Sequence, residues 1–208
     1  MIQNDPAAVT AAVTAAVTSA VASADLVVLD AAAVAERAGA AGEPAAGEFA
    51  AAAHRILAEL VAAGAALGWL EPPSAEEVAA LVEQVLARSR AGDGALRAAY
   101  LDGRLVGFGY WLRHQRPTHR PHADLEKLAV SAAAQGRGIG RALTAALIAD
   151  ARAAGIEVLT LDARGDNADA LHLYFSLGFT EYGRLPDYVA VGERRYDKVF
   201  AMLDLRRS

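Results

Sequence analysis

A glycine-rich turn gives the strongest chemical signal in the sequence. Residues 135–140 read Gln-Gly-Arg-Gly-Ile-Gly and follow an apolar segment that ends at Val130. An amphipathic segment begins at Gly138, within the second half of the turn, and continues beyond it. Glycine has no side chain, so a ligand can approach such a backbone closely. The first N–H groups of a helix have no partner within the helix and bind anions. We therefore expect a phosphate site here, with a plain flexible connection as the alternative.

Two common nucleotide-binding motifs do not fit this turn. The dinucleotide motif G-x-G-x-x-G fails because Arg141 stands where the third glycine would follow Gly136 and Gly138. The phosphate loop of NTPases fails because the turn lacks Gly-Lys-Ser and Gly-Lys-Thr. The pattern therefore disfavours a nucleotide-binding oxidoreductase.

Glu126 is the first candidate for acid–base chemistry. It lies on a predicted strand, residues 125–130, that is otherwise apolar or small apart from one lysine. Strand alternation places Glu126, Leu128 and Val130 on one face and the two residues between them on the other. A carboxylate beside apolar side chains has a raised pKa, which suits a general base. Pairing with a nearby arginine is the alternative.

Asp162 is the second candidate, because it follows the short apolar strand 158–161. The carboxyl ends of strands are where α/β proteins bind ligands. Asp162 could share the role of base or orient an amine. The alternative is a capping role in the turn 162–167, since aspartate commonly caps helices.

The glycine turn and a later segment resemble two ordered motifs of the GCN5-related N-acetyltransferase (GNAT) family. The turn, after a strand ending in Leu-Ala-Val, is similar to that family's pyrophosphate loop for acetyl-CoA. The later segment is similar to the family's next motif and lies at the expected distance. The two motifs read Gln135-x-x-Gly138-x-Gly140 and Asn167-x-x-Ala170-x-x-x-Tyr174-x-x-x-Gly178-Phe179. The resemblance covers residues 125–179, and the remainder from Asp25 agrees in element order only.

This resemblance implies acetyl-CoA as co-substrate and assigns its contacts. The backbones of Leu128 and Val130 would pair with the pantetheine arm, and Asn167 would hydrogen-bond the cofactor. Tyr174 would donate a proton to the departing thiolate. The alternatives need no ligand: Asn167 would cap a helix, Tyr174 would be a core tyrosine, and the two arginines of the turn would be solvated. The remaining cofactor-binding residues would be Gln135, Gly136, Arg137, Gly138, Ile139, Gly140 and Arg141.

Shorter matches resemble the tabtoxin-resistance branch of small-molecule acetyltransferases. They are Leu125-Glu126-Lys127-Leu128, Leu161-Asp162, Arg184–Tyr188 and, for a substrate-side loop, Ala66–Leu70. This branch implies an amine-bearing toxin, antibiotic or amino-acid analogue as acceptor. Candidate substrate-binding residues are Trp69, Trp111, Arg113 and Tyr188, and a core position is the alternative for both tryptophans.

Arginines in two segments predict the charge of the acceptor. They occur in residues 184–196 and in the loop 114–122, and we expect them to form a rim of arginines around the acceptor pocket. Guanidinium groups pair well with carboxylates, so we expect a small amine that also carries a carboxylate. The loop 114–122 also holds three histidines, but nothing else nearby supplies converging ligands, so no metal site is predicted.

The hydrophobic periodicity predicts an α/β (α+β) fold, and the GNAT resemblance implies a mixed, mostly antiparallel central sheet with helices on both faces. Asp102-Gly103 predicts a tight hairpin, and Ser74 with Glu77 forms a capping box. Expected helices are 31–40, 48–64, one after Ser74, 138–154 and 167–177. Expected strands are 26–29, 96–101, 104–113, 125–130, 158–161, 179–184 and 196–205, with a loop between the last two.

Composition excludes several classes of protein. The chain has 208 residues, a net charge of −5 and no cysteine, which excludes disulfides, thiolate metal sites and a cysteine nucleophile. Its acidity argues against nucleic acid, and its apolar runs are too short for a membrane span. Residues 1–24 repeat Ala-Ala-Val-Thr without Lys or Arg, so we interpret them as a low-complexity arm rather than a signal peptide. We expect residues 25–208 to form one domain and the protein to be cytoplasmic. The sequence leaves open whether the protein forms a homodimer.

These observations predict an acetyl-CoA-dependent N-acetyltransferase that acts on a small amine by direct attack, with a carboxylate as general base. Two alternatives remain. One is a protein or peptide amine acetyltransferase. The other is an acyl-CoA-binding regulatory module without turnover, which would not need the two carboxylates and the tyrosine.

Overall fold

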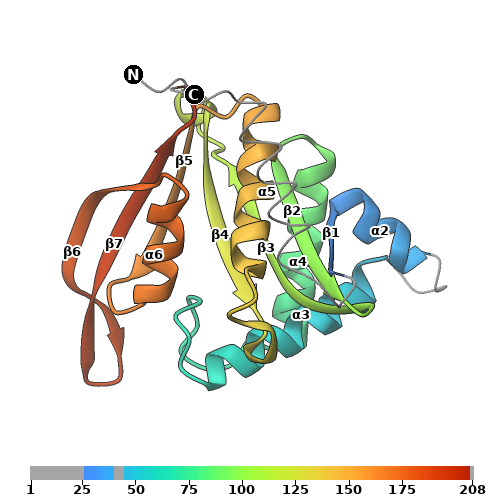
Figure 1. Ribbon diagram of the computed structural model, residues 1–208, viewed down its shortest axis with the longest axis horizontal. Helices are drawn as coiled ribbons and strands as arrows, with labels where there is room; N and C mark the ends of the chain where they lie inside the picture. The colour runs from blue at the N-terminus through green and yellow to red at the C-terminus, as the bar shows by residue number, and fades with distance from the viewer. Residues whose placement is uncertain (1–25, 40–44, 207–208) are drawn as a thin grey trace.

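The computed structural model describes residues 26–39 and 45–206, so the predicted arm 1–24 lies outside the described residues. Seven strands form one sheet in the order β1-β2-β3-β4-β5-β7-β6. All neighbouring strands are antiparallel except β4 and β5, which are parallel. Helices lie on both faces of this sheet, as Figure 1 shows. The predicted mixed, mostly antiparallel fold is therefore confirmed.

The elements follow the predicted order closely. The strands are β1 (Leu26–Asp30), β2 (Gly94–Leu101), β3 (Arg104–Arg113), β4 (His122–Val130), β5 (Val158–Arg164), β6 (Thr180–Val191) and β7 (Arg194–Asp204). The helices are α2 (Ala31–Gly39), α3 (Ala45–Ala62), α4 (Ala75–Arg90), α5 (Ile139–Ala153) and α6 (Ala168–Ser176). Two 3-10 turns lie at Pro117–His119 and Ala132–Ala134. In the described part of the chain, no helix is long and apolar enough to cross a bilayer.

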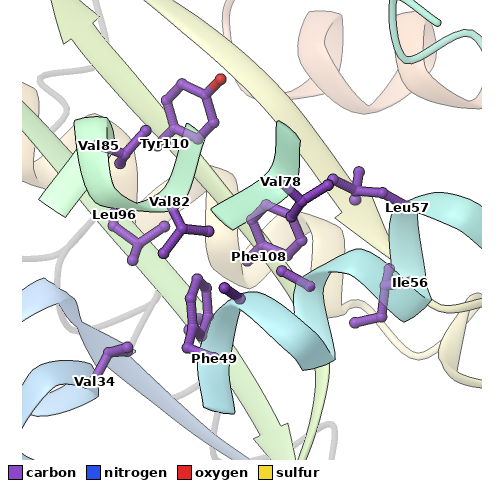
Figure 2. Close-up of a cluster of buried hydrophobic side chains, with 14 of the residues drawn as sticks. Val34, Phe49, Ile56, Leu57, Val78, Val82, Val85, Leu96, Phe108 and Tyr110 are labelled. Atoms are coloured by element: carbon purple, nitrogen blue, oxygen red, sulfur yellow. The ribbon is translucent and has the colours of Figure 1, made fainter. Parts of the chain in front are cut away.

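Alternating strand residues divide the core between the two faces of the sheet. One cluster joins α2, α3 and α4 to Leu96, Phe108 and Tyr110 of β2 and β3 (Figure 2). Phe49 meets Phe108 edge-to-face in this cluster, with 5.7 Å between ring centres. The opposite face packs α5 and α6 against strand residues such as Trp111. Burial of both faces of the central strands explains why their sequences are nearly continuous apolar runs.

Local sequence signals fix two of the boundaries. At the start of α4, the Ser74 hydroxyl accepts a hydrogen bond from the Glu77 N–H at 3.1 Å, and the Glu77 carboxylate accepts one from the Ser74 N–H at 2.8 Å. The capping box is therefore present as predicted. Asp102 and Gly103 both have positive φ, 50° and 76°, which is the conformation that a tight hairpin turn requires.

The prediction of a loop between the last two strands is wrong. β6 continues to Val191 and pairs with β7 along a long hairpin whose turn is Gly192-Glu193. Pro186 is accommodated because the pairing register shifts between Leu185 and Val189, and Asp187 there has a φ of 53°. A bulge lets a proline sit in a strand without losing a ladder hydrogen bond.

The parallel strands β4 and β5 separate soon after they start. They pair only at three positions, from His122 opposite Val158 to Asp124 opposite Thr160. Beyond Asp124, β4 stays paired with β3, and β5 stays paired with β7. The facing edges of β4 and β5 therefore diverge in the middle of the sheet, and their backbone groups there have no strand partner.

Candidate active site

A cavity of about 430 Å³ lies where β4 and β5 diverge. Its walls come from these two strands, from α6, from Tyr182 and Phe200 of the β6–β7 hairpin, and from residues 66–68 after α3. Figure 1 locates these elements around the open ends of β4 and β5. The ionisable and polar side chains that line it include Asp124, Glu126, Lys127, Asp162, Asn167, Tyr174 and Tyr182.

A β-bulge in β4 orients the residues of this cavity. Gly109 of β3 lies opposite two residues, Lys127 and Leu128, and Lys127 takes a left-handed backbone with a φ of 48°. Such an insertion reverses which side chains face each side of the sheet. Glu126 therefore shares a face with Tyr110, its partner on β3, whereas Leu128 packs on the α5 side. The predicted placement of Glu126 and Leu128 on one face is wrong for this reason.

Glu126 has the environment that the sequence predicted for a general base. Its side chain is half-buried, and burial is the main cause that raises its pKa above the usual value. The Lys127 charge opposes this increase, while the Asp124 and Asp162 charges add to it. The Tyr110 hydroxyl lies 3.4 Å from Glu126 Oε2 and also favours the ionised form. No arginine pairs with Glu126 within the described ranges, so the alternative of an ion-pair partner is not supported.

The other two carboxylates of the cavity are held by neighbours. Asp162 Oδ1 lies 3.0 Å from Lys198 Nζ on the adjacent strand β7. Asp162 stands inside β5 rather than at its end, and Asn167 is the residue that caps the next helix. Asp124 accepts a short hydrogen bond from Thr160 and lies 3.6 Å from His114 Nε2.

Tyr174 reaches the cavity from α6. It is 8% exposed, and its ring meets Phe179 edge-to-face at 5.8 Å. Burial, with a smaller effect of the Asp162 charge, raises the pKa of Tyr174 to about 12. The phenol therefore keeps its proton at any ordinary pH and can act as a proton donor. Its packing also fits the predicted core tyrosine, so both interpretations describe the same side chain.

The glycine turn leads directly into α5. Gly136 and Gly138 both have a φ of 75°, and a Cβ atom at either position would meet open space. These glycines are therefore needed for the backbone conformation and not for packing. Gly138 precedes α5 without a side-chain cap, so the N–H groups of the first helical turn have no partner in the helix. The sequence predicted an anion site at this helix start, and the uncapped N–H groups are compatible with that prediction.

Two side chains of this turn, Gln135 and Arg141, and Asn167 at the start of α6 have hydrogen-bond partners inside the protein. The Gln135 amide donates to the Val130 carbonyl at 3.1 Å. Arg141 donates to the Ser176 hydroxyl of α6 at 2.7 Å. Asn167 caps α6 by accepting from the Ala170 N–H at 3.3 Å. The Val130 carbonyl thus already accepts one hydrogen bond, and its second lone pair stays available to a ligand.

Two predicted substrate residues do not reach the cavity. Trp111 is 1% exposed and packs in the α5 and α6 core, which confirms its alternative as a core residue. Arg113 lies at the closed end of the strand pair, where its guanidinium donates to the carbonyls of Arg120 and Ala154. Side chains alternate along a strand, and Trp111 points to the α5 and α6 side of the sheet. The sequence spacing could not tell which of the two sides of the strand would face the cavity.

The other two predicted substrate residues, Trp69 and Tyr188, do not line the cavity themselves but contact lysines at or beside it. The Lys127 ammonium lies 4.8 Å from the centre of the Trp69 ring. The Lys198 ammonium lies 5.7 Å from the centre of the exposed Tyr188 ring and also pairs with Asp162. Trp69 and Tyr188 therefore each contact a lysine at or beside the site.

The prediction that arginines form the rim of the acceptor pocket is wrong for the cavity that the structure describes. Arg184 pairs with Glu181 and Asp197, and Arg120 pairs with Asp93. The cavity wall, as far as the structure describes it, contains no arginine side chain. Its cations are Lys127 in the wall and Lys198 behind Asp162.

Sequence reasoning missed several residues of the site. Tyr110 was missed because its contact with Glu126 depends on the strand register across the bulge. Tyr182 and Phe200 lie in two predicted strands, but they were missed because the position of these strands beside β5 depends on the order of the sheet. The available signal for the bulge was Gly109, since an isolated glycine inside a strand pattern often marks one.

Residues 61–179 match the acetyltransferase (GNAT) family, and they cover more than half of the chain. The chain belongs to this family. The family's acyl donor is acetyl-CoA, and the match includes the glycine turn, Glu126, Asp162 and Tyr174. The resemblance stated from the two motifs is therefore confirmed.

Individual relatives agree with this assignment. A mycothiol acetyltransferase of Saccharomonospora viridis is 38% identical over 91 residues, which are 42% of this chain and 30% of that protein. An L-methionine sulfoximine/L-methionine sulfone acetyltransferase of Salmonella typhimurium is 32% identical over 99 residues, which are 48% of this chain and 51% of that protein. The chain thus spans about a third to a half of the length of these curated relatives.

The fold also has close structural neighbours. A protein of Salmonella typhimurium, described as an acetyltransferase and solved with its cofactor acetyl-CoA, superposes with a TM-score of 0.68. The match covers 88% of this chain and 95% of that chain at 23% identity. At this identity the likeness supports the fold.

Proposed function

We propose that this protein transfers an acetyl group from acetyl-CoA to the amine of a small molecule, with Glu126 as the general base. The observation that carries the proposal is the position of Glu126, half-buried in the cavity between the diverging strands. The uncapped start of α5 lies beside the end of β4, since a Cβ atom at Gly140 would lie 3.9 Å from Val130 Cγ2.

The described residues fit acetyl-CoA as co-substrate. The N–H groups that begin α5 suit its pyrophosphate, and Arg137 adds positive charge beside them. The unpaired edge of β4 suits the amide groups of the pantetheine arm, because an extended amide chain can add to a strand edge. Leu128 of β4 and Gly140 of α5 lie close together, because a Cβ atom added at Gly140 would be 4.0 Å from Leu128 Cδ2.

The transfer step needs a base and an acid. The attacking nitrogen must lose a proton, which Glu126 accepts directly or through one water. The nitrogen forms a bond to the acetyl carbonyl carbon, and the bond from that carbon to sulfur breaks. Tyr174 gives its proton to the departing thiolate and recovers it from solvent. No covalent acetyl-enzyme is needed, and the chain has no cysteine to form one.

The size of the cavity and the relatives together favour a small, amino-acid-like acceptor. About 430 Å³ lies within the usual range for small-molecule sites. One relative is named for methionine sulfoximine, which is an α-amino acid. We extend the proposal to amines of this class, including amino-acid-like toxins and antibiotics.

A thiol-release assay with acetyl-CoA and a panel of amines tests the proposal. We expect CoA release that requires both the protein and an amine, and an equal amount of acetylated amine by mass spectrometry. Glu126→Gln should abolish most of this turnover. Glu83→Gln, which changes an exposed carboxylate on α4, is the matched control and should retain it. Tight CoA binding without turnover of any amine would instead identify a binding module.

A further inference from the structure

We propose that Lys127 binds the carboxylate of the acceptor and thereby selects amines that carry one. This inference rests on the proposed function, because it names the group that recognises the substrate of the same site. It replaces the arginine rim expected from the sequence with a single lysine in the cavity wall.

The backbone holds Lys127 in an unusual conformation. Its φ of 48° places it in the left-handed region, which side-chain-bearing residues seldom adopt without a compensating role. Lys127 is the extra residue of the bulge, so its side chain enters the cavity instead of following the strand alternation. Glycine or asparagine would meet the backbone requirement with less strain. The backbone conformation alone therefore does not require a lysine at this position.

The neighbours of Lys127 fix its ammonium group without neutralising it. The ammonium lies 4.8 Å from the centre of the Trp69 ring, and it would lie 3.2 Å from a Cβ atom at Gly68. The aromatic face stabilises a cation but supplies no opposite charge. Among the described residues Lys127 has no ion-pair partner, although the side chain is half-buried.

The carboxylates of the cavity are engaged elsewhere. Asp162 pairs with Lys198 at 3.0 Å, and Asp124 is held by Thr160 and lies near His114. Glu126 contacts Tyr110 on the neighbouring strand, and although the Lys127 charge acts on it, the two groups form no ion pair within 4.0 Å in the described structure. A half-buried ammonium without a carboxylate partner favours an anionic group from a ligand.

The position of Lys127 next to the base matches one class of acceptor. An α-amino acid carries its amine and its carboxylate on the same carbon atom. Lys127 and Glu126 are adjacent in the chain and both line the cavity. One such molecule can therefore present its amine to Glu126 while its carboxylate meets Lys127.

The test compares each acid with its own amide. L-Methionine sulfoximine, L-methionine and L-phenylalanine are assayed beside their α-carboxamides, with kcat/KM calculated on the concentration of free-base amine. All measurements are made on the plateau of the pH profile, because Lys127 also lowers the pKa of Glu126. We expect the wild-type protein to prefer the acids by about 10- to 100-fold, the usual value of a hydrogen bond between charged groups.

Two variants separate recognition from structure. Lys127→Met keeps an apolar stem and should bring the acid-to-amide ratio close to one, mainly by raising KM for the acids. Lys127→Arg should retain much of the ratio. Binding is followed independently through Trp69 fluorescence, which should respond to the acids in the wild-type protein and not in Lys127→Met.

The outcomes distinguish this inference from the proposed function. An unchanged ratio in Lys127→Met, or an equal loss for acids and amides, would overturn the role of Lys127. Acetylation of tyramine or spermidine in preference to every acid would overturn it as well while leaving acetyl transfer intact. Failure to acetylate any amine would overturn the proposed function itself.

Discussion

Replacing Glu126 with glutamine should stop turnover while making the folded protein more stable at neutral pH. Glutamine has nearly the same shape as glutamate and can still contact the Tyr110 hydroxyl, which lies 3.4 Å from the carboxylate. It cannot accept a proton at any relevant pH. The substitution therefore removes the chemistry and leaves the cavity in place.

The rate loss can be bounded from the structure. Removal of a general base costs about 10²- to 10⁴-fold. Asp124 and Asp162 also line the cavity, but Thr160 and Lys198 hold them. Neither can replace Glu126 fully, so we expect a loss of about 10³-fold, which corresponds to about 4 kcal/mol of transition-state stabilisation.

The stability change has the opposite sign. Burial raises the pKa of Glu126 in the folded state above its usual value. Such a group contributes stability that is present below the unfolded pKa and is lost as pH rises through the folded pKa. The ionised carboxylate therefore destabilises the wild-type protein at pH 7. Glu126→Gln should melt at a higher temperature there and at nearly the same temperature near pH 4.

The assay combines kcat/KM against pH with thermal melts at the same pH values. The wild-type profile should rise through the raised pKa of Glu126, and Glu126→Gln should lack this rise. Tyr110→Phe is a matched control, because it removes a contact that favours the ionised form and should move the rise to higher pH. If Glu126→Gln keeps more than about a tenth of the activity on the plateau, Glu126 is not the base.

Three further predictions concern other parts of the molecule. Gly138→Asp should weaken CoA binding at least about tenfold by calorimetry while the protein stays folded, because its carboxylate opposes the pyrophosphate; the neutral Gly138→Asn is the control, and equal affinities would contradict the phosphate site. Tyr174→Phe should lower kcat by about 10²-fold, and the wild-type rate should show no fall from Tyr174 below pH 10, since its pKa is raised to about 12. Ser74→Ala should lower the free energy of unfolding by about 1 kcal/mol in urea without changing kcat, and an unchanged stability would mean that the capping box does not stabilise α4.

Short local signals predicted much of the fold. The Ser74 capping box, the Asp102-Gly103 turn and the glycine turn each depend on a few neighbouring residues, and all three appear at the expected places. The order of elements follows from hydrophobic periodicity, which tertiary packing preserves here. The anion site stays a prediction, but the uncapped helix start on which it depends was visible in the sequence.

The errors arise where the pairing between strands decides the structure. One inserted residue at Lys127 turns Glu126 and Leu128 to opposite faces, and the pattern of residues 125–130 itself does not indicate this insertion. A second bulge carries β6 past Pro186, which a sequence pattern interprets as the end of a strand. The positions of two loop segments predicted arginines near the acceptor, but the partners of these arginines, Glu181, Asp197 and Asp93, are visible only in the folded protein.

The most direct test of direct acetyl transfer is intact-mass spectrometry of the protein with acetyl-CoA, first alone and then with an amine acceptor. We expect no change in protein mass and no thiol release with acetyl-CoA alone. Addition of L-methionine sulfoximine should then give one free CoA thiol for each acetylated amine. A stable acetyl adduct on the protein before the amine is added, or thiol release without acetylated product, would contradict direct attack at the Glu126 cavity.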